Sequence, residues 1–392
     1  MDTDLIRAQT PGTRHAVHLN AAGSALAAAP VLAEVVAHLT LESEIGGYEA
    51  ADAAAGRLAA SYGTLAELVG AAPGEIAFTE SATRAWDQAF YAIPFKPGDR
   101  ILTTTSEYSS NALAYAQAAR RHGTVTEVVP DDADGTIDLT ALEESLGRGG
   151  VRLVALNHVP THDGLINPAA EVGALARAHG ALFLLDACQS VGQLPVDVSA
   201  LGVDLLSATG RKFLRGPRGT GFLYVRGGVL DQLEPAVVDL CAADLTGPSS
   251  FTFRPDARRF ESWERSVAGQ LGLAAAARYA LDLGLDAIAE RVQGLAARLR
   301  AGLADVPGIT VHDRGRHKSG IVTFGHTSAP AATIVQGLAA RGVVTRVSEQ
   351  TYRYDDGPTP AARVRASVHY YNTEDEIDTA VTTLAALLRT LA

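Results

Sequence analysis

The feature that most constrains the fold is a regular alternation of short apolar runs and helical stretches between about residues 75 and 226. The apolar runs are EIAFT, RILTTT, TVTEVVP, VRLVALNHV, ALFLLDAC, VDLLSAT and TGFLYVR. Helical periodicity lies between several of them, as in ATRAWDQAFYAI, NALAYAQAARRHG and PAAEVGALARAHG. Such alternation predicts an α/β fold with a mostly parallel, seven-stranded sheet covered on both faces.

The sequence pattern changes after RRFESWERSVAGQLGL. Residues 268–305 read as two helices, followed by the short strands GITVHD, GIVTFGH, GVVTRV and RVRASVHYY and by helices near 330–341 and 374–391. We therefore expect an N-terminal segment (1–16), a large domain (17–266) and a smaller α+β domain (267–392).

Composition narrows the class of partner. With 47% apolar and 20% charged residues, the chain is typical of a soluble globular protein. A net charge of −11 argues against nucleic acid or an anionic membrane as the main partner. We see no uninterrupted apolar run of about 18–20 residues and no signal peptide in MDTDLIRAQT. Cys188 and Cys241 give neither a disulfide framework nor a paired-cysteine metal spacing, so we expect a cytoplasmic protein.

Lysine is rare in this chain. Only Lys96, Lys212 and Lys318 are lysines among 33 basic residues. Arginine stays protonated, whereas lysine can lose its proton and attack a carbonyl carbon. Lys96 and Lys318 lie in a predicted turn and loop, but Lys212 follows an apolar run and precedes a glycine-rich turn. Lys212 is therefore the candidate nucleophile, although composition alone favours an ordinary structural lysine.

Ligands of open α/β sheets bind beyond the carboxyl ends of the strands, so the residues there are the candidates for a site. Ser81, Ala82 and Thr83 open a helix after EIAFT and could hold a phosphate, or simply cap the helix. Tyr108, which follows RILTTT together with Asn111, could stack on a flat ligand or pack on the sheet edge.

Three further strands end in polar residues. Asn157, His158 and Thr161 could bind a ligand, while His158, His162 and Asp163 lack a fourth metal ligand, so we predict no metal. Asp186 ends an apolar strand, where a carboxylate is costly unless paired, although it could also cap a helix.

The last of these segments is TGRKFLRGPRGTG, which brings Thr209, Arg211 and Lys212 together. It is not a Walker A loop, because the lysine precedes most of the glycines and Phe213 follows it. Together the strand ends require a ligand with a phosphate, a flat ring, a ring cation and an electrophilic carbon. Pyridoxal phosphate has all four, so we predict it as the cofactor.

Beyond these single residues, LLDACQSVGQLPVDV and TGRKFLRGPRGTGFLYV resemble the class V aminotransferase family of fold-type I pyridoxal-phosphate enzymes. The resemblance runs from HLNAAG near residue 18 to HYYNTEDEID near residue 378. Within the family, RGPRGTGFLYVR and RRFESWERSVAG are most similar to hercynylcysteine sulfoxide lyases and isopenicillin N epimerase-like members. The resemblance implies a fold-type I homodimer in which FESWERS reaches the partner subunit.

The resemblance also implies roles for matching positions. Lys212 would form the Schiff base with the cofactor, Asp186 would pair with the pyridine nitrogen, and Gln189 would bind the ring hydroxyl. Tyr108 takes the place of a ring-stacking aromatic residue that is usually histidine. The phosphate would be held by Ala82, Thr83, Thr209 and Arg211.

On the substrate side, Arg365 matches the arginine that binds the α-carboxylate, and Asn157 would lie near the cofactor hydroxyl or the substrate. We expect Tyr48, Tyr352 and Arg353 to be further substrate contacts, because YRYDDGPTP and ESEIGGYEA are expected to line that side.

The predicted reaction depends on a missing residue. Desulfurases of this family carry a nucleophilic cysteine on the loop before the carboxylate-binding arginine, but residues 346–365 contain none. We therefore predict a C–S lyase that acts on a cysteine S-conjugate or its sulfoxide, in ergothioneine or natural-product biosynthesis, with Lys212 as general base. An aminotransferase, an epimerase, a decarboxylating or deaminating enzyme, and a non-catalytic cofactor-binding protein are the alternatives.

Overall fold

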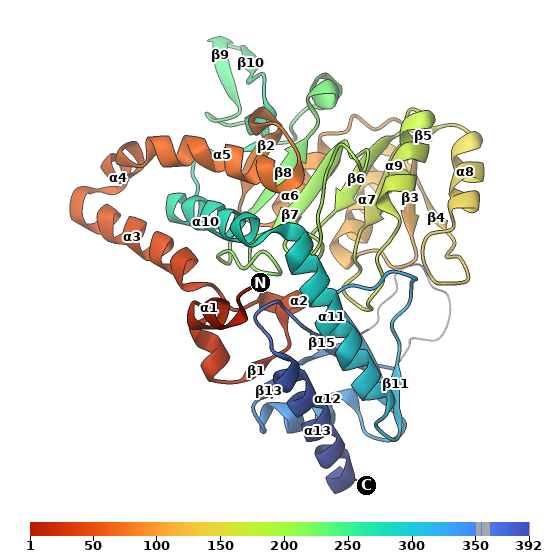
Figure 1. Ribbon diagram of the computed structural model, residues 1–392. Helices are drawn as coiled ribbons and strands as arrows, with labels where there is room; N and C mark the ends of the chain where they lie inside the picture. Colours follow the sequence, from red (N-terminus) through yellow and green to blue (C-terminus); the bar gives the residue numbers. More distant parts are fainter. Residues whose placement is uncertain (350–353, 355–360, 392) are drawn as a thin grey trace.

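The computed structural model describes residues 1–349, 354 and 361–391. A helix-covered sheet forms the large domain, and a smaller sheet with three helices packs below it in the view of Figure 1. The chain thus has the α/β architecture that the sequence pattern predicted.

The central sheet contains all seven predicted strands, in the order β2-β8-β7-β6-β5-β3-β4. Six strands run in one direction, and β8 is antiparallel to both of its neighbours. The bounds are β2 (Ile76–Thr79), β3 (Arg100–Thr104), β4 (Val125–Val129), β5 (Val151–Asn157), β6 (Leu182–Asp186), β7 (Leu205–Thr209) and β8 (Gly221–Val225). Because the parallel strands end at one edge, the polar residues that follow them converge there.

Helices cover both faces of this sheet, which explains the continuous apolar runs. They include α6 (Ala82–Tyr91), α7 (Ser109–His122), α8 (Leu139–Gly147) and α9 (Ala169–Ala178). Successive residues of β6 point to opposite faces: Leu184 packs in the core with Trp86 and Phe90, and Phe183 in the core with Val172. The two cores hold the strand ends in place from both sides.

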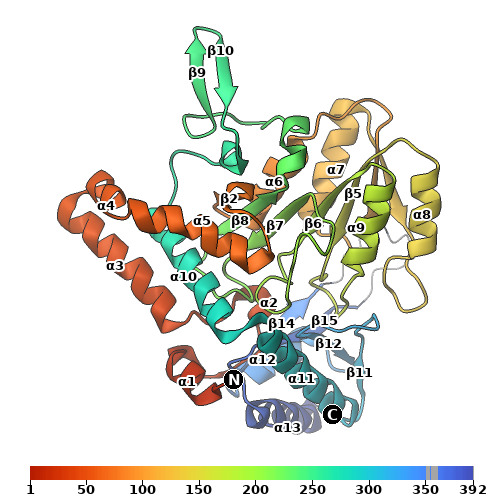
Figure 2. The same cartoon turned by 45° about the horizontal axis from the view of Figure 1, so that its top comes forward.

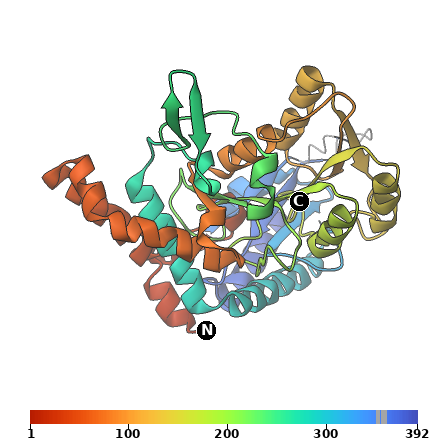
Figure 3. The same ribbon diagram turned by 90° about the horizontal axis from the view of Figure 1, so that it is seen from above.

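The part of the chain that precedes the central sheet includes a projecting arm, formed by α3 and α4. It comprises α1 (Thr3–Ala8), η1 (Pro11–Arg14), β1 (Val17–His18), α2 (Ala21–Ser24), α3 (Ala29–Ile45), α4 (Gly47–Ala53) and α5 (Ala55–Val69). Figure 3 shows α3 and α4 extending away from the body of the molecule. Both α3 and α5, the helix that returns from α4, pack on α10 (Val267–Leu283).

A hairpin that the sequence pattern did not predict also projects from the large domain. Its strands are β9 (Ala243–Gly247) and β10 (Ser250–Phe253), which pair antiparallel and stand clear of the sheet in Figure 2. Most of its residues are exposed, so it lacks the apolar alternation that marks a packed strand. The remaining short helices are η2 (Pro73–Glu75), η3 (Gly227–Gln232) and η4 (Ala257–Phe260).

The small domain is an antiparallel four-stranded sheet in the order β11-β12-β15-β14. Its elements are α11 (Leu285–Ala304), β11 (Ile309–Val311), β12 (Ile321–His326), α12 (Ala331–Ala339), β13 (Val343–Val344), β14 (Arg346–Ser348), β15 (Arg363–Ser367) and α13 (Glu374–Leu391). β1 pairs in parallel with β13, so Val17 and His18 contact the small domain although they were predicted to begin the large one.

One stretch, Ala21–Ile45, is long and apolar enough to cross a membrane by length and composition, with a mean hydropathy of 1.6. It combines α2 and α3 and carries charged residues on α3, among them Glu34, which pairs with Arg57 of α5. A helix that packs against a protein surface passes the same test, so this property alone does not assign a membrane.

β8 lies very close to the start of α6, at the edge of the sheet where the polar residues converge. A Cβ atom added at Gly221 would lie 2.5 Å from the Ala208 carbonyl oxygen and 2.9 Å from the Ala82 nitrogen. We expect Gly221→Ala to lower the free energy of unfolding by about 1–3 kcal/mol, because backbone atoms cannot move aside cheaply. Urea unfolding followed by circular dichroism measures this change.

The matched control is Gly63→Ala in α5, where nothing lies within 4 Å of the added atom. This change should stabilise the helix by about 0.5–1 kcal/mol. Equal unfolding midpoints for the two variants would contradict the close packing of β8 on α6.

Candidate active site

A cavity lies where the parallel strands of the large sheet end. The lining residues are Ser81, Ala82, Thr83, Tyr108, Asn157, Thr161, Asp186, Cys188, Gln189, Thr209, Arg211 and Lys212. All ten residues that the sequence predicted for cofactor binding therefore line one cavity.

Lys212 lines this cavity, and its amine has no hydrogen-bond partner in the described part of the chain. Burial lowers the pKa of the Lys212 amine, while Cys188 and Asp186 oppose that effect and Arg211 adds to it. A lowered pKa leaves more of the amine unprotonated near neutral pH, which is the form that attacks an aldehyde.

The turn after Lys212 is held by a buried arginine that sequence reasoning missed. Arg215 has a positive φ of 63°, which a non-glycine residue rarely adopts. Its guanidinium donates to the Leu26 carbonyl oxygen at 2.8 Å, to the Tyr370 hydroxyl at 3.0 Å and to Thr10 Oγ1 at 2.6 Å. The three partners lie in distant segments of the chain, so no local sequence pattern predicts these contacts. Together they fix the backbone that carries Lys212.

Asp186 is 5% exposed and forms no ion pair with any described residue. One carboxylate oxygen accepts a hydrogen bond from the Cys188 backbone at 3.0 Å, and the other accepts one from Asn111 Nδ2 at 3.2 Å. A buried carboxylate without a cation is costly. The cavity therefore suits a ligand that brings a positive charge to Asp186, as a pyridinium does.

The opposite wall suits an anion. Ser81 caps α6, and its hydroxyl accepts a hydrogen bond from the Arg84 backbone nitrogen at 3.2 Å. This helix terminus presents the free N–H groups of its first turn, and Thr209 and Arg211 line the cavity beside it. Arg211 also donates a hydrogen bond to the Gly23 carbonyl oxygen, which connects α2 to the site. A phosphate group fits this donor set.

Between the two walls lie groups that suit a flat, hydroxylated ring. Gln189 Nε2 donates to the Ala22 carbonyl oxygen and to Thr161 Oγ1, each at 3.1 Å, and its buried Oε1 has no partner in the described part of the chain. Tyr108 is 40% exposed and precedes α7. Residues of all the kinds that pyridoxal phosphate requires are thus present.

Arg365, on β15 of the small domain, lies beside the cavity but is not one of its lining residues. It donates hydrogen bonds to the Thr161 carbonyl oxygen and to Thr161 Oγ1, and its buried Nε has no described partner. Burial, together with the charges of Arg346 and Arg211, lowers the pKa of Arg365 to about 10. An arginine in this position suits the carboxylate of a substrate.

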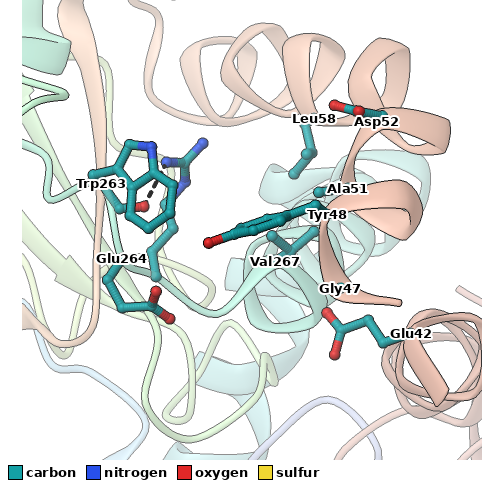
Figure 4. Close-up of a pocket in the computed structure, with 10 residues that line it drawn as sticks. Glu42, Gly47, Tyr48, Ala51, Asp52, Leu58, Trp263, Glu264 and Val267 are labelled. Atoms are coloured by element: carbon teal, nitrogen blue, oxygen red, sulfur yellow. Dashed lines mark hydrogen bonds between the residues drawn. The ribbon is translucent and has the colours of Figure 1, made fainter. Parts of the chain in front are cut away.

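Not every predicted substrate contact is brought to this cavity. Tyr48 is 73% exposed and faces Trp263 across a different pocket, with ring centroids 6.0 Å apart (Figure 4). Tyr352 and Arg353 lie outside the described residues. His158 is buried with its pKa lowered to about 4, and the described residues hold no cluster of three or more metal-ligating side chains.

Sequence reasoning also missed Glu107, which immediately precedes Tyr108 and is 2% exposed. The only hint in the local sequence is that Glu107 is an acidic residue shortly after an apolar strand. Its contacts, described below, connect it to Asp186.

Comparison with known proteins identifies the family of the chain. The family model for class-V aminotransferases matches residues 17–380. The chain belongs to this family. A probable cysteine desulfurase of Pyrococcus abyssi is 28% identical and covers 98% of both chains. Probable cysteine desulfurase 2 of Mycobacterium leprae is 34% identical over 83% of this chain and 79% of its own length.

Solved structures show the same fold. The apo cysteine desulfurase from Thermococcus onnurineus NA1 has a TM-score of 0.89 and 26% identity, and covers 99% of this chain and 98% of its own. The cystine C–S lyase C-DES, solved with its product cysteine persulfide, has a TM-score of 0.87 and 26% identity, with 96% and 99% covered. A mutant of that lyase carries glycine covalently linked to its pyridoxal-phosphate cofactor. The chain described here is a pyridoxal-phosphate-dependent enzyme of fold type I.

Lys212→Ala should lose the covalent bond to the cofactor. Reduction of the wild-type holoenzyme with borohydride should raise the protein mass by one reduced cofactor, whereas the variant should gain none, because no other lysine lines the cavity. Intact-protein mass spectrometry measures the gain. Lys96→Ala, at an exposed turn, is the control and should behave as wild type. A cofactor-sized gain in the Lys212 variant would disprove the assignment.

Proposed function

We propose that this enzyme is a C–S lyase that cleaves a cysteine S-conjugate or its sulfoxide by β-elimination. When bound, pyridoxal phosphate supplies an electron sink that makes the proton on the substrate α-carbon acidic. The other proposed roles fall to Lys212, which lines the cavity, and to Arg365, which contacts Thr161 of the cavity wall.

The observation that carries this proposal is the absence of cysteine between residues 346 and 365. Cys188, the one cysteine that lines the cavity, has a thiol whose pKa is raised well above its usual range by burial and by Asp186. A thiol that stays protonated is a poor nucleophile. We therefore expect the sulfur atom to leave as part of a released thiolate or sulfenate. In the desulfurases that the chain resembles, sulfur is instead taken up as a persulfide on the enzyme.

The proposed roles follow from the geometry. Arg365 binds the substrate carboxylate, and Lys212 accepts the α-proton as general base. The electron pair of that C–H bond forms the double bond between the α- and β-carbons, and the C–S bond breaks with its pair on sulfur. A thiolate leaves from an S-conjugate, or a sulfenate from a sulfoxide, and hydrolysis of the remaining fragment gives pyruvate and ammonia.

The choice of substrate rests on the segments RGPRGTGFLYVR and RRFESWERSVAG. Their similarity to hercynylcysteine sulfoxide lyases supports a cysteine sulfoxide from ergothioneine or related thiol biosynthesis as the first substrate to test. Two free cysteines support the reducing cytoplasm as the compartment.

We also infer that two copies of the chain associate through the arm formed by α3 and α4. Leu32, Val36 and Leu39 form an exposed apolar row on α3, with 58%, 51% and 51% of each residue exposed. A pocket that Glu42 of α3 also lines adds two exposed aromatic residues, Tyr48 and Trp263 (Figure 4). An apolar surface of this kind is typical of subunit contacts. In such a dimer Tyr48 would serve the partner's site.

The lyase activity is tested by incubating the holoenzyme with cysteine S-conjugates and sulfoxides. We expect pyruvate, ammonia and a free sulfur product in equal amounts, and no sulfur added to the protein by mass spectrometry. A desulfurase would instead leave sulfur on a cysteine. Conversion of the cofactor to pyridoxamine phosphate without pyruvate release would favour an aminotransferase.

The association is tested with Leu32→Glu combined with Val36→Glu. Two buried charges at the proposed contact should shift the sedimentation equilibrium from dimer to monomer. The control is Leu113→Glu on α7, where the side chain is 71% exposed and outside the arm. A wild-type chain that sediments as a monomer, or a double variant that stays dimeric, would exclude the arm as the contact.

A further inference from the structure

Glu107 is a buried carboxylate with no role in the chemistry described so far. It follows β3 and precedes Tyr108, and it is 2% exposed. Acidic side chains are seldom fully buried without a partner of opposite charge. Glu107 has no ion pair with any residue that the structure describes, so its placement in the interior needs another explanation.

Four neutral donors surround this carboxylate. Oε1 accepts hydrogen bonds from the Tyr108 backbone at 2.6 Å and from Asn111 Nδ2 at 3.0 Å. Oε2 accepts from Thr103 Oγ1 and from the Tyr115 hydroxyl, each at 2.7 Å. An ionised carboxylate offers acceptors for all of them, whereas a protonated one must give up an acceptor to become a donor. The donor set is built for the charged form.

Asn111 connects Glu107 to the cofactor site. The same amide nitrogen that donates to Glu107 also donates to Asp186 Oδ2 at 3.2 Å. Turning the amide over would direct its oxygen at two carboxylates, so the two contacts fix its orientation. Asn111 is itself 2% exposed, and the bridge is therefore shielded from water.

The charges of the two carboxylates are coupled through this bridge. Burial raises the pKa of Glu107 to about 7, the hydrogen bonds from Thr103, Tyr115 and Tyr108 oppose the rise, and the charge of Asp186 adds to it. The other titratable groups that face Glu107 are Tyr115 and Tyr354, and both have raised pKa values, so they stay protonated near neutral pH. An ionised Glu107 thus adds negative potential behind Asp186.

We propose that Glu107 is a positioning residue of the cofactor site, which holds Asp186 in place through Asn111 and increases the preference of the site for a ring that carries a cationic nitrogen. The proposal rests on the cofactor, and its readout is cofactor binding, so it stands or falls separately from the lyase reaction.

The test compares two ligands on the apoenzyme: pyridoxal phosphate, and its carbocyclic analogue in which a C–H group replaces the ring nitrogen. Glu107→Gln keeps the shape of the side chain and can still accept from Tyr108 and Asn111, while the Thr103 and Tyr115 hydroxyls can rotate to accept from the new amide. We expect the affinity for pyridoxal phosphate to fall roughly tenfold, as is usual for groups in one hydrogen-bond network, and the affinity for the analogue to stay within about twofold. Fluorescence titration measures both.

Equal losses for the two ligands would overturn the proposal, because a purely structural role does not distinguish the rings. Unchanged affinities for both would overturn it as well.

A second variant keeps the test informative if Glu107→Gln does not fold. Tyr115→Phe removes one donor to Glu107 and should raise its pKa further, so that Glu107 becomes neutral at neutral pH. The preference for the natural cofactor over the analogue should fall in that variant and return toward the wild-type ratio in more alkaline buffer. A ratio that stays at the wild-type value throughout contradicts the proposal.

The matched control is Glu261→Gln. Glu261 is also buried, 4% exposed, and accepts from the Phe78 backbone at 2.8 Å and the Tyr62 hydroxyl at 2.9 Å. It neither lines the cofactor cavity nor bonds to Asp186. We expect its variant to keep the wild-type ratio of the two affinities, and a fall as large as that of Glu107→Gln would show that the effect is not specific to Glu107.

Discussion

The active site depends on one costly arrangement, a carboxylate at the end of a buried strand that forms no ion pair with any described residue. Asp186 ends β6 and is satisfied by two hydrogen bonds, one from the Cys188 backbone and one from Asn111. Two neutral donors only partly offset the loss of water around a charge. The site therefore suits a ligand that brings positive charge to this position. The sheet holds Asp186 in a fixed geometry, which makes the site specific for such a ligand.

Burial acts in opposite directions on the two nucleophiles of the cavity. It lowers the pKa of the Lys212 amine and raises that of the Cys188 thiol, because in both cases the neutral form is favoured. The neutral form of an amine is its reactive form, whereas the reactive form of a thiol is the anion. Burial thus favours the reactive form of Lys212 and the unreactive form of Cys188. This difference is consistent with a reaction that releases sulfur to solution and does not transfer it to the protein.

Much of this could be predicted because the sheet is parallel. Seven apolar runs gave seven strands, and residues such as Asp186 and Thr209, which follow such runs or end them, had to converge at one edge. Contacts between distant segments could not be predicted in this way, because no local sequence pattern marks them. Arg215 binds Thr10 and Tyr370 across the chain, and Glu107 acts through a side chain four residues away that meets another strand. The hairpin β9–β10 escaped because its residues are exposed, and Tyr48 lies on an arm whose position depends on packing, not on periodicity.

The small domain contributes the other half of the recognition. Arg365 pairs in register with Arg346 on the neighbouring strand, so two like charges face each other across β14 and β15. The contact of Arg365 with Thr161 ties this strand to the wall of the cavity. A substrate carboxylate bound there would relieve the repulsion and at the same time link the small domain to the large one. Binding energy from the carboxylate would thereby hold the α-carbon near Lys212, so that recognition of an amino acid and its reaction depend on the same arginine.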